Sequence, residues 1–102
     1  MYIFRSSIYP SLGKAPEVRA LLEAQVKSEQ AKGVAAALAL TVFGPDLGFI
    51  VNRRFDDLAA YESWRHSRQS DPAVQEYLAK VGSLSRQAPN LELNEVLIPF
   101  PR

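Results

Sequence analysis

Two arginines in strand-like segments are the residues of this sequence whose types and spacing best support binding chemistry. Arg5 lies in the segment 2–9, and Arg54, with Asn52 before it, lies in the segment 49–55. A guanidinium inside a sheet needs a counter-charge, which Glu92, Glu95 or an anionic ligand would supply. The pattern therefore predicts a pocket for a carboxylate, phenolate or similar anion. The candidate pocket residues are Arg5, Tyr9, Thr41, Asn52, Arg54 and Glu92.

The same arginines have a second interpretation, in which they form a structural ion-pair network or reach solvent at the strand ends. Because strand side chains alternate between faces, a shift of one residue in register exchanges Arg53 and Arg54. The sequence leaves open which of these two arginines faces the candidate pocket.

Other chemistry-bearing residues have simpler structural explanations. His66 is the single histidine and lies between arginines, so we expect it to be solvated or to cap its helix rather than to act as a general base. Tyr61, Trp64 and Tyr77 are spaced as on helices, which favours core or dimer packing over an aromatic ligand box. The acidic residues that precede Leu58 favour a helix cap over a metal site.

The composition excludes several classes of function. The chain has 102 residues, no cysteine and a formal net charge of +1. These values exclude disulfides, cysteine-ligated metals and thiol nucleophiles, and they give no basic surface for nucleic acid. We predict no metal and no cofactor. The first residues lack the pattern of a signal peptide, and no apolar run is long enough to span a membrane, so we expect a cytoplasmic protein.

Periodicity and turn residues predict the elements that must position these side chains. Segment 2–9 is a predicted strand, and segment 16–32 is a predicted amphipathic helix that ends at Gly33. Segments 34–43 and 49–55 form a predicted hairpin around Gly44-Pro45. Further predicted elements are a helix from Leu58, a break before Pro72, a helical segment to Gly82 and a last strand over 91–98.

This order predicts one α+β domain over residues 1–102 with a ferredoxin-like βαββαβ fold. Its four-stranded antiparallel sheet has strands one and three in the middle and helices on one face. The other face would expose Ala35, Ala37, Ala39 and Phe43, an apolar patch that monomers rarely tolerate. We therefore expect a homodimer in which two sheets pack face to face as a dimeric α/β barrel.

Several short motifs resemble the NIPSNAP family of the dimeric α/β-barrel superfamily. They are Leu47-Gly48, Asp57-Leu58, Asp71-Pro72, Gln75-Glu76-Tyr77-Leu78 and the tail Leu97-Ile98-Pro99-Phe100-Pro101. Three positions depart from the family pattern: Arg53 stands where a Trp is common, Tyr61 where an Arg is common, and Val74 where an aromatic residue often follows Asp-Pro.

The resemblance implies the βαββαβ dimer and assigns no reaction. Two functions remain open. In the first, a pocket inside the barrel binds a small aromatic or anionic organic ligand, with the cofactor-free monooxygenase or isomerase chemistry found in the wider superfamily. In the alternative, the protein is a non-catalytic dimerisation and interaction module whose barrel is filled by its own side chains. Whether this chain is an enzyme is not decided by its residues.

Overall fold

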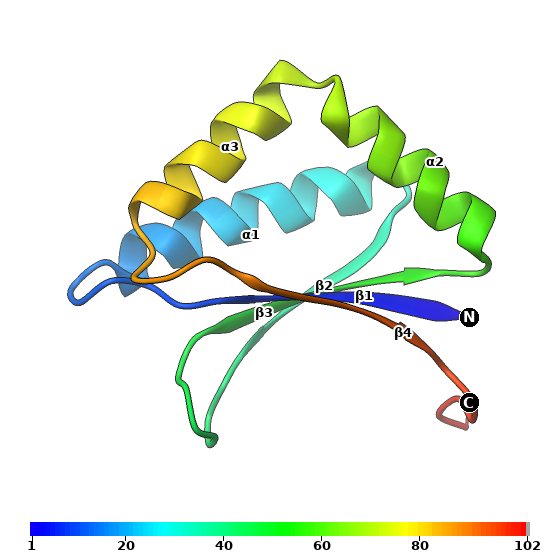
Figure 1. Ribbon diagram of the computed structural model, residues 1–102, viewed down its shortest axis with the longest axis horizontal. Coiled ribbons are helices and arrows are strands. Elements are labelled where there is room, and N and C mark those ends of the chain that lie inside the picture. The colour runs from blue at the N-terminus through cyan, green and yellow to red at the C-terminus, as the bar shows by residue number, and fades with distance from the viewer. Residues whose placement is uncertain (102) are drawn as a thin grey trace.

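The computed structural model describes residues 1–101 and has the predicted order of strands and helices, with the second helical region divided in two. Figure 1 shows three helices lying on one face of a curved sheet, as the ferredoxin-like prediction requires. The elements are β1 (Tyr2–Ile8), α1 (Ala15–Ala31), β2 (Ala35–Leu40), β3 (Phe49–Phe55), α2 (Leu58–Gln69), α3 (Pro72–Ser83) and β4 (Asn90–Glu95).

The sheet has the order β2-β3-β1-β4 and all of its pairs are antiparallel. The predicted central position of the first and third strands is therefore confirmed. Arg5 lies opposite Asn52 on one side and opposite Glu92 on the other. This register decides which side chains share a face, because alternate residues of a strand point to opposite sides.

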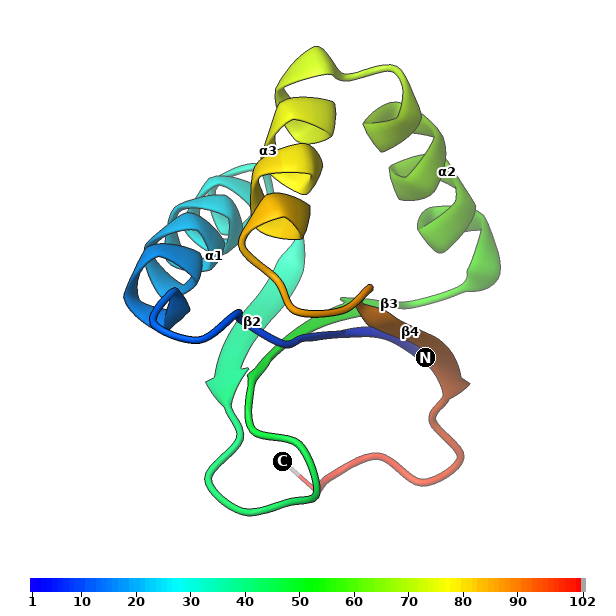
Figure 2. The same cartoon turned by 60° about the vertical axis from the view of Figure 1, so that its left-hand side comes forward.

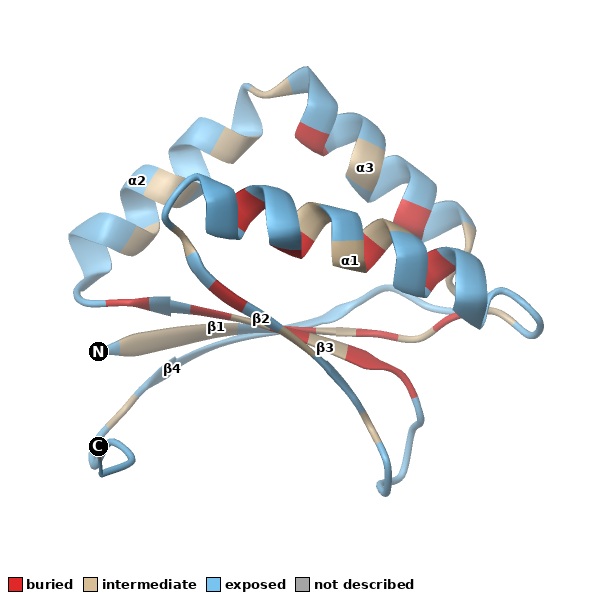
Figure 3. Ribbon diagram, turned by 180° about the vertical axis from the view of Figure 1, so that it is seen from behind, coloured by how far each residue is buried: buried red, intermediate tan, exposed pale blue. Residues whose placement is uncertain are grey.

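The core lies between α1 and the middle of the sheet. Val18, Leu22 and Val26 follow the predicted helical spacing along α1 and are buried against Val51 of β3 and neighbouring residues. Figure 3 shows buried positions spaced along α1 and further buried positions in the strands that it covers. Glu29 continues the same stripe and is also buried, which the prediction from the sequence missed.

Helices α2 and α3 form an arch whose apex lies away from the sheet (Figure 2). The break between them falls at Asp71-Pro72 as predicted, and each helix begins with an aspartate cap. The Asp57 carboxylate accepts a hydrogen bond from Ala60 N at 2.8 Å, and the Asp71 carboxylate accepts one from Ala73 N at 3.0 Å. The spacing of Leu58, Tyr61 and Trp64 predicts a buried stripe on this helix. The prediction is wrong for Leu58, which is exposed, and within α2 no residue is fully buried.

The last strand is shorter than the predicted 91–98. Its ladder with β1 ends at the pair Tyr2↔Glu95, and Val96 N donates a final hydrogen bond to Met1 O at 2.9 Å. Residues 97–101 lie beyond the end of β1, and the prolines at 99 and 101 have no N–H to donate. The second strand is likewise shorter than its apolar run, because Thr41 begins the loop that leads to β3.

Gly48 makes the close approach that lets this loop return to the sheet. A Cβ atom at Gly48 would overlap the carbonyl oxygen of Ile8, which is backbone and cannot rotate away. We expect Gly48→Ala to lower the free energy of unfolding by about 1–3 kcal/mol, as overpacking does. Chemical denaturation measures this change.

Gly82→Ala is the matched control, since a Cβ there meets no atom within 4 Å. Gly82 lies in α3, where alanine is a better helix former than glycine, so this variant should be unchanged or more stable by up to about 1 kcal/mol. Equal stability of both variants would contradict the assigned role of Gly48.

Candidate functional site

A buried ion pair joins α1 to β3 on the helix side of the sheet. Arg53 Nε donates to Glu29 Oε1 at 2.5 Å, and Arg53 Nη2 donates to Glu29 Oε2 at 2.8 Å. Arg53 is 2% exposed and Glu29 is 6% exposed. Gln25 Nε2 donates a further hydrogen bond to Glu29 Oε2 at 2.9 Å. This bidentate geometry fixes the guanidinium of Arg53 in one orientation.

An aromatic cluster anchors α2 to the sheet next to this ion pair. Trp64 lies with its ring centroid 5.6 Å from that of Phe4 and 5.3 Å from that of Phe55. Tyr61 contacts the same two phenylalanine rings at 5.6 and 5.7 Å. The guanidinium carbon of Arg53 lies 5.0 Å from the centroid of Trp64, within cation–π range. The predicted packing role of these aromatic side chains therefore agrees with their contacts.

Arg68 brings a second guanidinium to the same indole. Its guanidinium carbon lies 4.5 Å from the Trp64 centroid. Its Nη1 is buried, and within residues 1–101 nothing accepts a hydrogen bond from it. A buried donor without a partner costs free energy, so this atom is a marked exception to ordinary packing.

The charges around this site act on one another. Burial works to raise the pKa of Glu29, but the hydrogen bonds and charge of Arg53, with Gln25, outweigh it and leave that pKa lowered. Burial, assisted by the like charge of Arg53, lowers the pKa of Arg68. Burial raises the pKa of Tyr77, so its phenol stays neutral near neutral pH. The cluster thus holds two positive charges and one negative charge.

Two open grooves meet at this cluster, one on each side of α2. The α2–β4 groove has a volume of about 740 Å³ and is lined by Phe4, Trp64 and Arg68 together with apolar residues of β4. A smaller cavity of about 90 Å³, shared by Arg53, Arg68 and Tyr77, continues it toward α3. This combination of apolar walls and a few convergent polar groups is typical of small-molecule sites.

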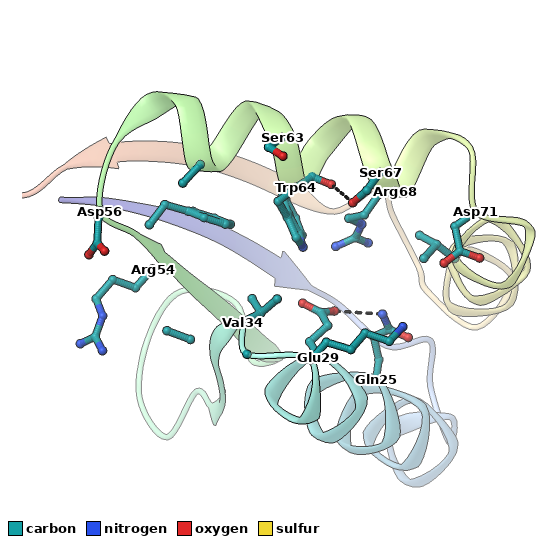
Figure 4. A pocket seen from close by; sticks show the side chains of 16 residues that line it. Gln25, Glu29, Val34, Arg54, Asp56, Ser63, Trp64, Ser67, Arg68 and Asp71 are labelled. Atoms are coloured by element: carbon teal, nitrogen blue, oxygen red, sulfur yellow. Dashed lines mark hydrogen bonds between the residues drawn. The ribbon is translucent and has the colours of Figure 1, made fainter.

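The α1–α2 groove, of about 860 Å³, opens on the other side of α2 and is more polar. Figure 4 shows Trp64 and Arg68 pointing from α2 into this space, with Glu29 and Gln25 of α1 facing them. Because Trp64 and Arg68 line both grooves, they form the partition between them.

The residues predicted from the sequence lie mainly on the opposite face of the sheet. A hollow of about 390 Å³ brings together Arg5, Tyr9, Thr41 and Glu92. Asn52 lies beside Arg5 in the register, whereas Arg54 lies opposite Ile3, nearer the end of the sheet, and lines the edge of the α1–α2 groove instead. The structure thus collects four of the six candidates in one hollow.

The register also decides the question left open for Arg53 and Arg54. Arg54 alternates onto the open face and is exposed, whereas Arg53 faces the helices and is buried. The open face presents Ala35, Ala37 and Ala39 of β2 as exposed residues. Residues 41–48 and 96–101 project from this same side of the sheet (Figures 1 and 2).

The remaining sequence candidates take structural positions. His66 is exposed in the last turn of α2, as expected for a solvated residue. Asp57 caps α2 through its side chain. Among residues 1–101 no group of three His, Cys, Asp or Glu side chains is placed to hold a metal ion. No helix in that same range is long and apolar enough to cross a membrane.

The predictions from the sequence missed the helix-side cluster, which consists of Glu29, Arg53, Trp64 and Arg68, although the sequence carries a signal for its ion pair. Glu29 follows Val18, Leu22 and Val26 at helical spacing, and Arg53 alternates with apolar residues of its strand. Each of these charged residues thus stands where the periodicity of its helix or strand places an apolar residue. Two opposite charges that both break an apolar stripe indicate a buried pair, because such charges are rarely buried alone.

Comparisons with solved structures place the fold among known proteins. An uncharacterised NIPSNAP domain protein from Burkholderia xenovorans has a TM-score of 0.80 at 13% identity, with 100% of both chains covered. A protein from Deinococcus radiodurans, provisionally assigned as an antibiotic biosynthesis monooxygenase, has a TM-score of 0.76 at 17% identity over 100% of this chain and 98% of its own. A NIPSNAP family protein from Agrobacterium tumefaciens has a TM-score of 0.71 at 19% identity over 98% and 94%.

No protein-family model and no curated protein matches this sequence. The structural likeness confirms the ferredoxin-like α+β prediction and the predicted likeness to NIPSNAP proteins at the level of the fold. Identities below 20% establish a shared fold and leave the activity to be argued from the side chains of this chain.

Proposed function

We propose that this ferredoxin-like domain binds a small, flat organic molecule in the α2–β4 groove. One observation carries the proposal: an apolar and aromatic groove converges on two guanidiniums, those of Arg53 and Arg68, stacked on one indole. Leu91 and Leu93 of β4 are exposed on the helix side, because the arch of α2 and α3 leaves that edge uncovered. A flat ligand would bury these leucines and contact Trp64.

The reaction class is a further part of the proposal. One structural neighbour is provisionally assigned as an antibiotic biosynthesis monooxygenase, and this supports cofactor-free oxygenation of a bound aromatic molecule as the chemistry to test first. Isomerisation of such a molecule is the other reaction that fits a pocket with a neutral phenol, that of Tyr77, beside two cations.

The proposed assembly is a homodimer that pairs the open faces of two sheets. The alanines of β2 allow the two sheets to approach closely. The partner would also cover exposed apolar side chains in the two projecting segments, residues 41–48 and 96–101. These side chains are Val42, Phe43, Leu47, Leu97, Ile98 and Phe100. A dimer would enclose the hollow that contains Arg5, Tyr9, Thr41 and Glu92, with Asn52 beside it, and so makes it a second candidate ligand site.

The alternative function is a dimerisation and interaction module without a ligand. On the open face Arg5 and Glu92 lie opposite each other in the register and could neutralise each other within the dimer. Native mass spectrometry of the freshly purified protein separates the two functions, since it reports both the subunit count and any retained small molecule. A retained organic mass supports the ligand-binding function.

Titration calorimetry with flat aromatic probes tests the helix-side groove. We expect 2-naphthoate, 2-naphthamide or both to bind, and Leu91→Trp to weaken that binding by at least about tenfold because its larger ring fills the groove. Leu12→Trp is the control, since Leu12 is fully exposed in the loop before α1. Absence of binding by both probes, or equal binding by the two variants, would contradict the proposed site.

A further inference from the structure

The polar end of the α2–β4 groove carries an unbalanced positive charge. Arg53 and Arg68 contribute two positive charges, and Glu29, which lies behind them on α1, contributes one negative charge. Tyr77 is neutral near neutral pH because burial raises its pKa. At the outer rim of the groove, Arg65 and Glu92 have opposite signs. The inner end therefore has a net charge of +1.

Glu29 pairs directly with Arg53, and although its charge also acts on Arg68, one carboxylate does not balance both cations. Its two carboxylate oxygens accept two hydrogen bonds from Arg53 and one from Gln25. Among the described residues, no carboxylate oxygen lies within 4.0 Å of the Arg68 guanidinium, and Nη1 of Arg68 has no acceptor. One cation at the end of an apolar groove thus has a donor without a partner.

We infer that the groove selects flat organic monoanions, whose carboxylate or phenolate group pairs with the guanidinium of Arg68. This inference rests on the proposed function and names the substrate class of the same site. The ring of the ligand lies against Trp64 and the leucines of β4, and its charge balances the excess cation. The oxygen of a neutral molecule would accept a hydrogen bond but leave the charge uncompensated.

Glu29 determines how many negative charges the preferred ligand carries. Because this carboxylate already pairs with Arg53, a ligand with two adjacent negative charges finds one free cation and faces repulsion from Glu29. The built-in counter-ion therefore discriminates against dianions as well as against neutral molecules.

Three probes of nearly equal shape test this charge selection by titration calorimetry. They are 2-naphthoate, 2-naphthamide and naphthalene-2,3-dicarboxylate, with one, zero and two negative charges near neutral pH. We expect 2-naphthoate to bind about ten- to a hundredfold more tightly than either of the others, the range expected when a charged hydrogen-bond partner is present or missing. Affinity of the amide equal to that of the acid would overturn the inference while leaving the proposed ligand site intact.

Variants of Arg68 test whether this residue causes the preference for the anionic probe. Arg68→Gln should bind 2-naphthoate and 2-naphthamide about equally, and Arg68→Lys should restore part of the preference for the anion. Arg19→Gln is the charge-matched control, because Arg19 pairs with Glu23 on the exposed side of α1. A loss of preference in Arg19→Gln as large as in Arg68→Gln would show that overall charge, rather than the cluster, selects the anion, and this would overturn the inference.

Removing the negative charge of Glu29 tests the inference in the opposite direction, because it should improve the binding of a dianion. Glu29→Gln keeps a side chain of the same shape and leaves the inner groove with a net charge of +2. In this variant naphthalene-2,3-dicarboxylate should gain affinity relative to 2-naphthoate. An unchanged ratio in a folded Glu29→Gln protein would contradict the role assigned to Glu29, and the comparison of probes on the unmodified protein decides the inference even where this variant does not fold.

Discussion

Replacing Glu29 with alanine is expected to lower the free energy of unfolding by about 3–5 kcal/mol, the cost of breaking a buried ion pair by removing one partner. Arg53 is 2% exposed, so its guanidinium would remain in the core without the two hydrogen bonds that Glu29 accepts. For a domain of this size such a loss is a large share of the total stability. Chemical denaturation monitored by circular dichroism measures it.

A double variant separates the cost of an unpaired charge from the worth of the pair. Glu29→Leu combined with Arg53→Met removes both charges and should recover most of the stability lost in Glu29→Ala, because apolar replacements of buried ion pairs are often neutral or stabilising. Glu23→Ala is the matched control on the same helix. Glu23 pairs with Arg19 on the exposed side, so its loss should leave the free energy of unfolding nearly unchanged. Equal losses in Glu23→Ala and Glu29→Ala would contradict this account.

The pH dependence of stability has a defined sign for this pair. The pKa of Glu29 is lowered in the folded protein, so the stability it contributes is fully present above the ordinary glutamate pKa. That contribution is lost as the pH falls through the lowered pKa. The double variant should therefore lose less stability on acidification than the unmodified protein does.

Introducing a carboxylate on the open face is expected to separate the proposed homodimer into monomers. Ala39 is exposed in β2 and lies opposite Ile50 in the register, so Ala39→Glu would place a charge in an apolar part of the sheet–sheet interface. Two-fold symmetry places the substitution in the interface twice. We expect the dimer dissociation constant to rise by at least about a hundredfold, measured by analytical ultracentrifugation over a concentration series.

Ala24→Glu provides the control for this substitution. Ala24 is exposed on α1, on the helix side of the sheet, and the same change there should leave the dimer intact. A monomer at micromolar concentration in the unmodified protein would contradict the proposed dimer itself. Dissociation by both variants would show that added negative charge, rather than its place on the open face, is responsible.

The topology could be predicted from the sequence because its signals are local. Gly33 and Asp71-Pro72 mark where helices end or restart. The apolar run 34–43 is bounded by Gly33 and Gly44-Pro45, and this position, with the strand-like segment 49–55 after the turn, favours a hairpin. Strand ends were less predictable, since the length of β4 depends on where its partner β1 begins to pair. That is a tertiary property which no local pattern contains.

The helix-side cluster could be predicted in part. Glu29 and Arg53 each interrupt an apolar stripe, but their pairing depends on how α1 lies across β3, which is set by packing. Arg68 carried a weaker signal, since an arginine near the end of a helix has several ordinary explanations. On the open face, Glu92 was one of the counter-charges expected for Arg5, and the structure places it opposite Arg5. That register depends on how the two strands pair, which no local pattern contains.

The sparse burial of α2 also determines which part of this protein unfolds locally most easily. Within Leu58–Gln69 no residue is fully buried, and the helix is held mainly by Tyr61, Trp64 and Arg68, whereas α1 is fixed by a continuous apolar stripe. Segments with few buried contacts are the first to undergo local unfolding, at a free energy well below that of the whole domain. The least stable cooperative unit of the fold is therefore the one that covers the candidate cavity. Its backbone amides should exchange with solvent before those of α1, so a molecule can enter while the core stays folded.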